Sequence, residues 1–464
     1  MYDQDIVVIG GGVGGYASAI HAAQLRARVT LVEKDKVGGA CLNRGCIPTK
    51  TLVRSVELLQ KVRQAAGTGI ETDGIRADFG KLMAHKNAVV DRLVAGVEQL
   101  LKGGRINVIR GPGRILSPHE VQVNDRTIST GKIIIATGSE PATLPVPGVD
   151  LPGVLNTDGI LELKSLPGSL VIIGGGYIGI EFAGIFSALG TKVTVIEALP
   201  RCLPTVEEEA CNLLLQTLRR QGVEVKTNAP VSAIRGEGEA LRVVFKSESG
   251  EGSATGQVVL AAVGRRPCTA GLGLEALGIE MNKRGIAANE HLETNVPGIY
   301  AAGDVLGRSM LAGVAFHEAE VAAKNAVGQV QCATDYRVVP TCVFTNPEIA
   351  SVGITEKEAK ERALDYRVSK FPFGACGAAL AMDEAQGTAK MICDAGTGAV
   401  LGMHIIGTHA SDLIGEVALA MKLGATAKDI AETIHVHPGL GEVVREAAMG
   451  QLGGAIHFRR VSRI

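Results

Sequence analysis

The sequence contains no tryptophan, and aromatic residues make up only 3% of its 464 residues. Its charges nearly cancel, because 47 lysines and arginines stand against 48 aspartates and glutamates, for a formal net charge of −1. Proteins that bind nucleic acids or anionic membranes through charge carry a clear excess of basic residues. The balance therefore gives no indication of either, and we predict neither a nucleic-acid partner nor a membrane partner.

The chain also lacks a long uninterrupted apolar run. The two most apolar stretches, residues 6–20 and 170–189, are broken by glycines, and the second carries Glu181 near its middle. No basic-then-apolar leader opens the sequence, and nine cysteines scattered mostly singly do not form a framework of structural disulfides. These absences predict a cytoplasmic protein. With 46% hydrophobic residues and 60 glycines, we expect a well-buried globular chain of about three domains.

A glycine-rich unit occurs near the N-terminus. An apolar run at residues 5–9 leads into Gly10 to Gly15, a helical pattern and a second apolar run that ends in Glu33. In such a unit the first glycine permits a tight turn, the second lets the backbone approach a pyrophosphate, and the third lets helix and strand pack closely. The helix N-terminus favours phosphate, and the acidic residue can accept hydrogen bonds from an adenosine ribose. This unit predicts a dinucleotide site that includes Gly10, Gly12, Gly15 and Glu33.

The same unit occurs a second time, after an apolar run at residues 170–173, and Glu197 follows its first glycine at the interval that separates Glu33 from Gly10. One such motif is a weak signal, because a glycine-rich turn can be purely structural. Repetition in the same order predicts two Rossmann-like sites, with electrons passing between two dinucleotides. A carboxylate at Glu197 favours a free 2′-hydroxyl, and therefore NAD over NADP, although Arg201 lies close in sequence. The second site is predicted to comprise Gly174, Gly176, Tyr177, Gly179, Glu197 and Gly264.

Residues 38–50 carry two cysteines, Cys41 and Cys46, five positions apart. On an ideal helix their Cα atoms would lie roughly 8–9 Å apart. A disulfide tolerates only roughly 7 Å. Gly45 and Pro48 predict a distorted or late-starting helix, in which a strained bridge could close, and strained cysteines at helix ends are reactive. From the spacing alone, two ordinary buried thiols remain an open alternative.

This segment resembles the active-site segment of the pyridine nucleotide-disulfide oxidoreductases, most closely that of the dihydrolipoamide dehydrogenases. The resemblance covers essentially the whole chain, because both glycine units, Ala136-Thr137-Gly138, Gly303-Asp304 and a carboxy-terminal His-Pro motif occur in the family's order. It implies an α/β fold with two Rossmann-like dinucleotide-binding domains plus a C-terminal α+β dimerisation domain. The implied domains are residues 1–144 for FAD, 145–268 for NAD, 269–338 completing the FAD site, and 339–464 forming a homodimer interface.

The resemblance also implies a reaction: dihydrolipoyl groups are oxidised through the Cys41–Cys46 disulfide and FAD, and NAD+ is reduced to NADH. Cys46 would be the flavin-proximal thiol, which forms a charge-transfer complex, and Cys41 the interchange thiol, which forms a mixed disulfide with substrate. Lys50 would lie near flavin N5, paired with Glu181, and Tyr177 would cover the nicotinamide face of the flavin. The implied FAD set is Gly10, Gly12, Gly15, Glu33, Lys50, Thr137, Gly138, Asp304 (at the ribitol) and Ala312. Read without the resemblance, Asp304 would be a helix cap after a strand.

A proposed base lies near the carboxy terminus, where His437 and Glu442 have the family's spacing for a His–Glu dyad. Histidine titrates near neutral pH and can take the proton from an incoming dithiol, and a carboxylate on its other nitrogen would fix the tautomer. The alternative is a surface histidine before a helix with Glu442 in its first turn. We predict no metal site. We interpret the remaining cysteines as packing residues: Cys202, Cys211, Cys268, Cys332, Cys342, Cys376 and Cys393. We interpret His404, His409 and His435 as supporting structure.

The sequence departs from the family at two places: Gly439 and Gly441 stand where Thr and Ser are usual, and Gly313 and Val314 stand where many dihydrolipoamide dehydrogenases have His and Lys. The expected partner is a lipoyl-bearing protein or free dihydrolipoamide, with a 2-oxoacid dehydrogenase complex as one candidate carrier. The alternatives are another flavin-dependent disulfide reductase or a non-catalytic flavoprotein scaffold. A mercuric reductase would carry a cysteine pair near its carboxy terminus, a soluble transhydrogenase would lack the paired thiols, and a glutathione-type reductase would carry arginines at the second ribose.

Overall fold

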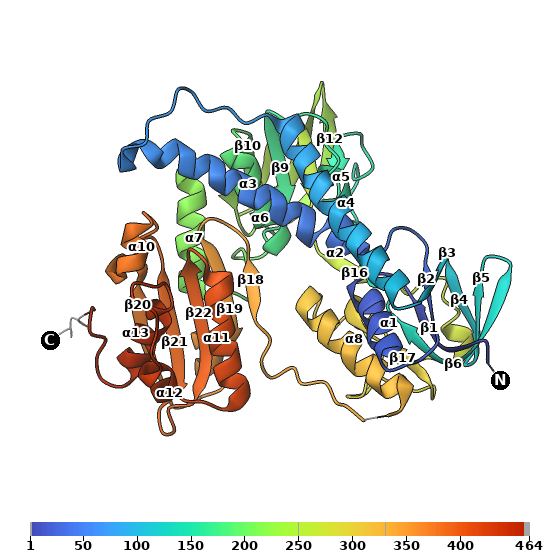
Figure 1. Ribbon diagram of the computed structural model, residues 1–464. Helices are drawn as coiled ribbons and strands as arrows, with labels where there is room; N and C mark the ends of the chain where they lie inside the picture. The colour runs from blue at the N-terminus through green and yellow to red at the C-terminus, as the bar shows by residue number, and fades with distance from the viewer. Residues whose placement is uncertain (1, 249, 330, 459–464) are drawn as a thin grey trace.

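The computed structural model describes residues 2–248, 250–329 and 331–458. Within these residues the strands form five sheets, three of which organise the molecule. In Figure 1 the N-terminal sheet lies at the right, the carboxy-terminal sheet at the lower left, and the second Rossmann-like sheet above and between them.

The N-terminal sheet has the order β3-β2-β1-β6-β5-β4, with β17 paired to β6. Its central strands are parallel, and Val7 and Ile134 are fully buried in them. Parallel strands covered on both faces read as continuous apolar runs, which is why these segments were recognisable in the sequence. The strands are β1 (Gln4–Ile9), β2 (Val29–Glu33), β3 (Asn107–Arg110), β4 (Gly113–Ser117), β5 (Glu120–Val123), β6 (Arg126–Ile135) and β17 (Ile299–Ala301).

Two helices far apart in the sequence lie side by side on this sheet, α1 (Val13–Gln24) and α8 (Ala312–Val327) (Figure 1). Both carry small buried residues where they meet, including Ala19 and Ala319, neither of which is exposed at all. Small side chains let helix backbones approach closely. Residues 299–327 therefore pack as part of the first Rossmann-like unit, with β17 in its sheet and α8 beside α1.

The second Rossmann-like sheet is parallel throughout, in the order β11-β10-β9-β15-β8. An antiparallel sheet, β12-β13-β14, extends this unit, and a two-stranded ribbon, β7 with β16, connects it to the first unit. The elements are β7 (Ser139–Pro141), β8 (Val154–Leu155), α5 (Thr157–Ile160), β9 (Ser169–Ile173), α6 (Tyr177–Ala188), β10 (Lys192–Ile196), α7 (Glu208–Arg220), β11 (Glu224–Lys226), β12 (Val231–Glu237), β13 (Ala240–Ser247), β14 (Gly250–Gly256), β15 (Val258–Ala261) and β16 (Arg265–Pro267).

The carboxy-terminal sheet is antiparallel, in the order β18-β19-β22-β21-β20. Together with the two parallel sheets, this mixed sheet-and-helix unit confirms the predicted fold class, whereas the exact domain boundaries stay a prediction. Its elements are β18 (Thr341–Val343), β19 (Glu348–Gly353), α9 (Glu356–Glu361), β20 (Tyr366–Pro372), α10 (Gly377–Ala381), β21 (Thr388–Asp394), β22 (Val400–Gly407), α11 (Ala410–Leu423), α12 (Ala427–Glu432) and α13 (Glu442–Gln451).

Three helices after β2 connect the two Rossmann-like units: α2 (Gly39–Arg44), α3 (Cys46–Gln64) and α4 (Phe79–Gly103). Leu52 and Val53 of α3 are 3% and 4% exposed and belong to the apolar core of the second unit. The helix that carries one of the paired thiols is thus fixed against the second unit. Among the described residues, no helix has the length and apolar character needed to cross a membrane.

Candidate active site

The two Rossmann-like units and the start of α8 enclose one continuous cavity of about 2170 Å³. Sites for a single small molecule commonly measure roughly 300–1,000 Å³, so this cavity has room for two dinucleotides. It brings together most of the predicted site residues: Gly10, Gly12, Glu33, Cys41, Cys46, Lys50, Thr137, Gly138, Gly174, Gly176, Tyr177, Glu181, Glu197, Gly264, Asp304 and Ala312. Gly15 and Gly179 lie behind its wall, and His437 and Glu442 do not line it.

The first glycine turn has the geometry that the motif predicts. Gly10 has a φ of +103°, and a Cβ at Gly15 would lie 1.7 Å from the Gly10 carbonyl oxygen, so helix and strand meet with no room for a side chain. The Glu33 carboxylate accepts hydrogen bonds from the backbone N–H groups of Gly11 and Asp35. Because each carboxylate oxygen has two acceptor positions, Glu33 keeps capacity for ribose hydroxyls.

The second glycine turn repeats this arrangement. Gly174 has a φ of +110°, and a Cβ at Gly179 would lie 2.0 Å from the Gly174 carbonyl oxygen. The Glu197 carboxylate accepts hydrogen bonds from the N–H groups of Gly175 at 2.6 Å and Leu199 at 2.7 Å. Arg201 does not face this carboxylate, since its guanidinium donates to nearby backbone carbonyls. A carboxylate rather than a guanidinium therefore lies against the second glycine turn.

The cavity also fits an extended flavin dinucleotide along the first unit. At Gly12 the nearest atom to an added Cβ would be the Gly39 Cα at 3.8 Å, so the backbone there stays open to the cavity. Gly39 has a φ of +57°, and a side chain on it would collide with Gly12. The cavity wall runs from Glu33 past these glycines to the paired thiols and Asp304. A wall of this length with open glycine backbone is compatible with an extended dinucleotide such as FAD.

Asp304 lies within a short 3₁₀ turn, residues Gly303–Leu306, whose N-cap is Ala302, so the alternative interpretation of Asp304 as a helix cap is wrong. Its carboxylate instead accepts a hydrogen bond from the Ser139 hydroxyl. Arg265 Nε donates to that hydroxyl at 2.8 Å, and Arg265 Nη2 donates to the Ser139 carbonyl at 2.7 Å. Our sequence analysis missed Ser139 and Arg265, although Arg265 directly follows Gly264.

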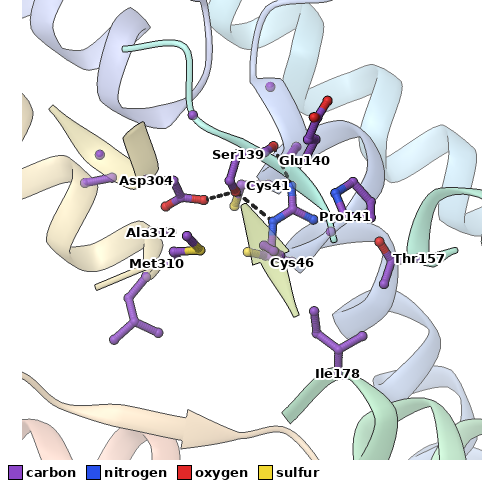
Figure 2. A pocket seen from close by; sticks show the side chains of 18 of the residues that line it. Cys41, Cys46, Ser139, Glu140, Pro141, Thr157, Ile178, Asp304, Met310 and Ala312 are labelled. Carbon is purple, nitrogen blue, oxygen red and sulfur yellow. Dashed lines mark hydrogen bonds between the residues drawn. The ribbon is translucent and has the colours of Figure 1, made fainter. Parts of the chain in front are cut away.

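The paired thiols lie where two helices meet. Helix α2 ends at Arg44, Gly45 breaks the helical path with φ −145° and ψ −107°, and α3 begins at Cys46. A Cβ on Gly45 would lie 2.9 Å from the Ala40 carbonyl oxygen, so glycine is required for this close turn. Cys41 and Cys46 are both free thiols here and are hydrogen-bonded to each other. The helix is broken between them and starts again at Cys46, in keeping with the distorted or late-starting helix predicted from Gly45 and Pro48, and both side chains face the cavity (Figure 2).

The two thiols are electrostatically unequal. The hydrogen bond from Cys41 lowers the pKa of Cys46 to about 7, with a further contribution from the Lys50 charge and against the effect of burial. The same hydrogen bond raises the pKa of Cys41, and burial adds to this effect. Cys46 is also the first residue of α3, where the helix dipole favours an anion. In the reduced pair the proton therefore stays on Cys41, and Cys46 carries the negative charge.

Lys50 forms an ion pair with Glu181, at 2.7 Å from Nζ to Oε2, across the two Rossmann-like units. Glu181 is only 4% exposed, and its other oxygen accepts a hydrogen bond from the Phe344 N–H at 3.0 Å. Burial raises the pKa of Glu181, and the Lys50 charge acts against this effect. Lys50 Nζ also lies 4.7 Å from the centre of the Phe344 ring. The ammonium group is thus held by the Glu181 carboxylate and the Phe344 ring, and its charge acts on the Cys46 thiol.

His437 and Glu442 form the expected pair, with 2.8 Å between Nδ1 and Oε1. Burial alone would raise the pKa of Glu442, but the hydrogen bonds from His437 and from the Gly439 N–H lower it below its ordinary range. A Cβ at Gly439 would lie 2.6 Å from the Val436 carbonyl oxygen, so this backbone path has no room for the family's usual threonine. The His437 side chain is 76% exposed and lies outside the thiol cavity. A single chain therefore does not bring this base to the thiols.

Most of the cysteines and histidines interpreted as structural take part in packing or local hydrogen bonds, but Cys268 and Cys342 also line the cavity. His435 Nε2 lies 2.9 Å from Glu416, and His404 is buried between Ser351 and the Ile354 carbonyl. Four of these cysteines are buried, namely Cys202, Cys211, Cys376 and Cys393. The other three, Cys268, Cys332 and Cys342, are partly buried. At the departure near α8, Gly313 borders open space and Val314 is buried.

Comparisons with known proteins agree with this geometry. The family model described as pyridine nucleotide-disulphide oxidoreductase matches residues 4–319, and the model of that family's dimerisation domain matches residues 339–448. The chain is 40% identical to a dihydrolipoyl dehydrogenase of Bacillus subtilis, over 98% of this chain and 99% of the relative. It is 41% identical to a dihydrolipoyl dehydrogenase of Chlamydia pneumoniae, over 98% of each. Among solved structures, the HOCl-induced flavoprotein disulfide reductase RclA from Escherichia coli matches with a TM-score of 0.87 and 32% identity, over 96% of this chain and 99% of that one.

Proposed function

We propose that this chain is an FAD- and NAD-dependent enzyme that oxidises dihydrolipoyl groups. The proposal proceeds from the fact that the chain belongs to the pyridine nucleotide-disulphide oxidoreductase family. The observation that carries the proposal is the unequal thiol pair, Cys41 and Cys46, on the wall of a cavity with room for two dinucleotides. Curated relatives of nearly equal length and about 40% identity share this activity by name, which favours the dihydrolipoyl substrate over other disulfides.

The thiol chemistry starts from the oxidised pair, Cys41 bridged to Cys46. A substrate thiol gives its proton to the base and attacks Cys41, which forms a mixed disulfide and releases Cys46 as a thiolate. The second substrate thiol then attacks its partner sulfur, so that oxidised substrate leaves and Cys41 retains a proton. The wall of the first unit, with Glu33 and Asp304, would hold FAD, which would supply the redox centre between the reduced thiols and NAD+. Lys50 holds positive charge beside the Cys46 thiolate, and Glu181 keeps Lys50 in place.

A homodimer is supported by the dimerisation-domain match. Ile434 and Val436, which shortly precede the proposed base His437, are both exposed. The same part of the chain exposes further large apolar side chains that a partner would cover: Leu419, Leu423, Leu452 and Ile456. We propose that His437 and Glu442 of one subunit serve the thiols of the other. An isologous interface buries the same patch from both chains, so it would form two equivalent shared sites.

The proposed substrate is a lipoyl-bearing protein or free dihydrolipoamide, a 2-oxoacid dehydrogenase complex is a candidate carrier, and the cytoplasm is the proposed compartment. Steady-state kinetics with a matched series of disulfides tests this assignment. We expect kcat/KM for lipoamide to exceed that for glutathione disulfide by at least about 100-fold. This ratio corresponds to a difference of about 2.7 kcal/mol in the stabilisation of the two transition states. A preference for glutathione disulfide would indicate another reductase, and no turnover with any disulfide would indicate a scaffold.

The thiolate predicts a pH dependence that can be measured by absorbance. In enzyme reduced by two electrons, the long-wavelength absorbance of the Cys46 thiolate beside oxidised flavin should rise with pH, with a midpoint near 7. Below that pH Cys46 gains a proton and the absorbance is lost. In Lys50→Met the midpoint should move up by about one pH unit, because a nearby positive charge favours the thiolate. A midpoint that does not respond to Lys50 would assign the low pKa to the Cys41 hydrogen bond alone.

The nucleotide preference depends on Glu197. We expect kcat/KM for NAD to exceed that for NADP by about 100-fold, because the carboxylate accepts from a 2′-hydroxyl and repels a 2′-phosphate. Glu197→Ala should narrow the ratio about tenfold, mainly by raising KM for NAD. Glu224→Ala, an exposed carboxylate on the neighbouring strand β11, is the control and should leave the ratio unchanged. A wild-type enzyme that prefers NADP would contradict the assignment.

A further inference from the structure

The loop of residues 198–207 connects the second ribose carboxylate to helix α7. Its residues Leu199 and Pro204 line the cavity. Leu203 N–H donates to the Gly175 carbonyl at 2.9 Å, and a Cβ at Gly175 would lie 2.5 Å from the Cys202 sulfur. This loop, which we term the nucleotide loop, therefore packs directly on the glycine turn that would hold the NAD pyrophosphate.

The nucleotide loop is held in an unusual conformation. Leu203 has a φ of +48° and is fully buried. A branched residue in the left-handed region is strained and persists only where its surroundings fix it. Here Arg201 Nη2 donates to the carbonyls of Leu203 at 3.2 Å, Pro204 at 3.0 Å and Val206. The loop is thus a fixed wall of the site.

The loop also reaches the residue predicted to cover the nicotinamide position. The Thr205 and Tyr177 hydroxyl oxygens lie 3.4 Å apart, and either can donate. Tyr177 is the first residue of α6, directly after the second glycine turn. The position of the loop therefore bears on both the pyrophosphate end and the nicotinamide end of the nucleotide site.

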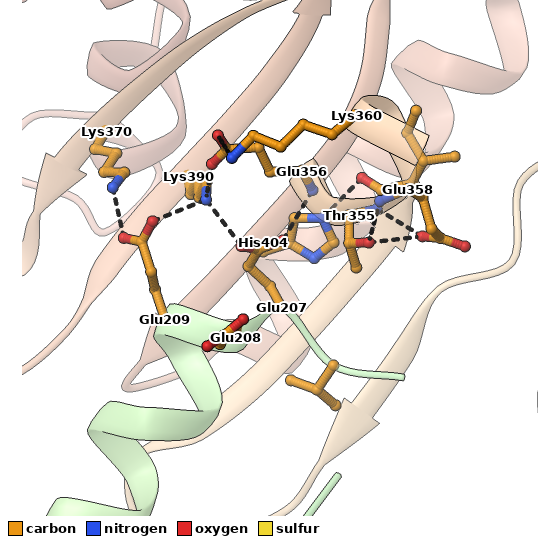
Figure 3. Close-up of polar contacts among 12 residues, drawn as sticks. Glu207, Glu208, Glu209, Thr355, Glu356, Glu358, Lys360, Lys370, Lys390 and His404 are labelled. Carbon is orange, nitrogen blue, oxygen red and sulfur yellow. Dashed lines mark hydrogen bonds and ion pairs between the residues drawn. The ribbon is translucent and has the colours of Figure 1, made fainter. Parts of the chain in front are cut away.

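The far end of the loop is tied to the carboxy-terminal domain by a buried ion cluster (Figure 3). Lys390 of β21, which is 2% exposed, lies with Nζ 2.8 Å from Glu207, 2.9 Å from Glu209 and 2.5 Å from Glu356. The three carboxylates lie close enough together to hold a metal ion, but the Lys390 ammonium group contacts all three.

Of the three carboxylates that contact Lys390, those of Glu209 and Glu356 also have a second lysine partner, whereas that of Glu207 does not. Glu209 also pairs with Lys370 at 2.5 Å, and Glu356 also pairs with Lys360 at 2.8 Å. Within the described part of the chain, Lys390 is the only cationic partner of Glu207, which is 4% exposed. Without Lys390 the buried Glu207 carboxylate would keep the hydrogen bond from the Glu356 N–H at 3.0 Å but would have no opposite charge. An uncompensated buried charge is costly, which favours displacement of Glu207 together with the loop.

We infer that Lys390 is a positioning residue for the nucleotide half-reaction: by holding Glu207 it fixes the nucleotide loop against the glycine turn and beside Tyr177. The inference rests on the proposed function only in taking NAD as the occupant of the second site. It assigns a role in nucleotide binding to a residue of a different domain, far from the thiols in sequence.

The test is a direct titration of NADH onto the FAD-loaded dimer, with thermal unfolding measured on the same samples. Lys390→Met should weaken NADH binding at least about tenfold, whereas the rate at which dihydrolipoamide reduces the flavin under anaerobic mixing should stay within about twofold. The matched control is Lys370→Met, since Lys370 belongs to the same cluster but, among the described residues, forms an ion pair with Glu209 and with no other carboxylate. It should bind NADH within about twofold of wild type.

A double variant, Lys390→Met with Glu207→Gln, separates positioning from stability. Removing both charges should restore most of the lost thermal stability, because no buried charge is left unpaired at this position. NADH binding should remain weak, because the anchor is still missing. If the double variant regains NADH affinity, or Lys390→Met binds NADH like wild type, the inference fails. A wild-type enzyme that does not bind NADH would instead contradict the proposed function.

Discussion

Replacing either Cys41 or Cys46 with serine is expected to lower kcat at least about 1,000-fold, and yet the two variants should have different absorbance spectra. The loss follows because the covalent route requires both sulfurs. The difference follows because the thiol pair is electrostatically unequal, with the anion at Cys46 beside Lys50 and the α3 N-terminus. Cys41→Ser should keep a Cys46 thiolate and show long-wavelength charge-transfer absorbance in the oxidised enzyme. Cys46→Ser should show none.

The measurement is an absorbance spectrum of each purified FAD-loaded variant, together with turnover. A third cysteine of the cavity wall, Cys342, provides the control. Burial raises the pKa of Cys342, so its thiol stays protonated and Cys342→Ser should keep both the spectrum and the rate within about twofold of wild type. Equal spectra for Cys41→Ser and Cys46→Ser would overturn the assignment of the two thiols.

The second large effect is complementation between inactive subunits. Cys41→Ser and His437→Gln homodimers should each be nearly inactive, because every site in them lacks either the interchange thiol or the base. In a heterodimer with shared sites, one site carries both defects and the other carries none. If sites act independently, each heterodimer should show about half of wild-type activity, and a statistical mixture roughly a quarter.

Heterodimers can be made by co-expression with two affinity tags and isolated before assay, which removes any dependence on subunit exchange. A heterodimer of His437→Gln with Glu442→Gln is the matched control. Both changes affect the same dyad, so each site has one defect and no site is intact, and little activity should be recovered. If verified Cys41→Ser and His437→Gln heterodimers also recover nothing, base and thiols come from the same subunit.

Much of the nucleotide chemistry could be predicted from the sequence because it is local. The turn at Gly10, the close packing at Gly15 and the carboxylate at Glu33 lie within one strand-turn-helix-strand unit, and the same holds for the second copy ending at Glu197. The break between Cys41 and Cys46 was likewise predictable, because Gly45 permits a close backbone turn that other residues do not.

The contacts between domains could not be predicted in this way. Arg265 holds Ser139 beside Asp304, and Lys390 holds Glu207, across separations in sequence for which the chain offers no local pattern. In sequence, a basic residue directly after an apolar strand, such as Arg265, is typical of a solvated surface. The same holds for a lysine within a strand, such as Lys390. Their burial against carboxylates or hydroxyls from another domain is decided by how the sheets pack.

By itself the sequence determined the two dinucleotide turns, the paired thiols and the pairing of His437 with Glu442, since each depends on backbone geometry and hydrogen bonds over a few residues. The pairing of Lys50 with Glu181 was implied by the family resemblance and by no local pattern, and only the tertiary structure decided that one cavity joins both nucleotide sites to the thiols. It also decided that His437 stands exposed outside that cavity. The physical reason is that these positions depend on how whole domains pack against one another. That packing must pair buried charges and bury apolar surfaces from distant segments at the same time.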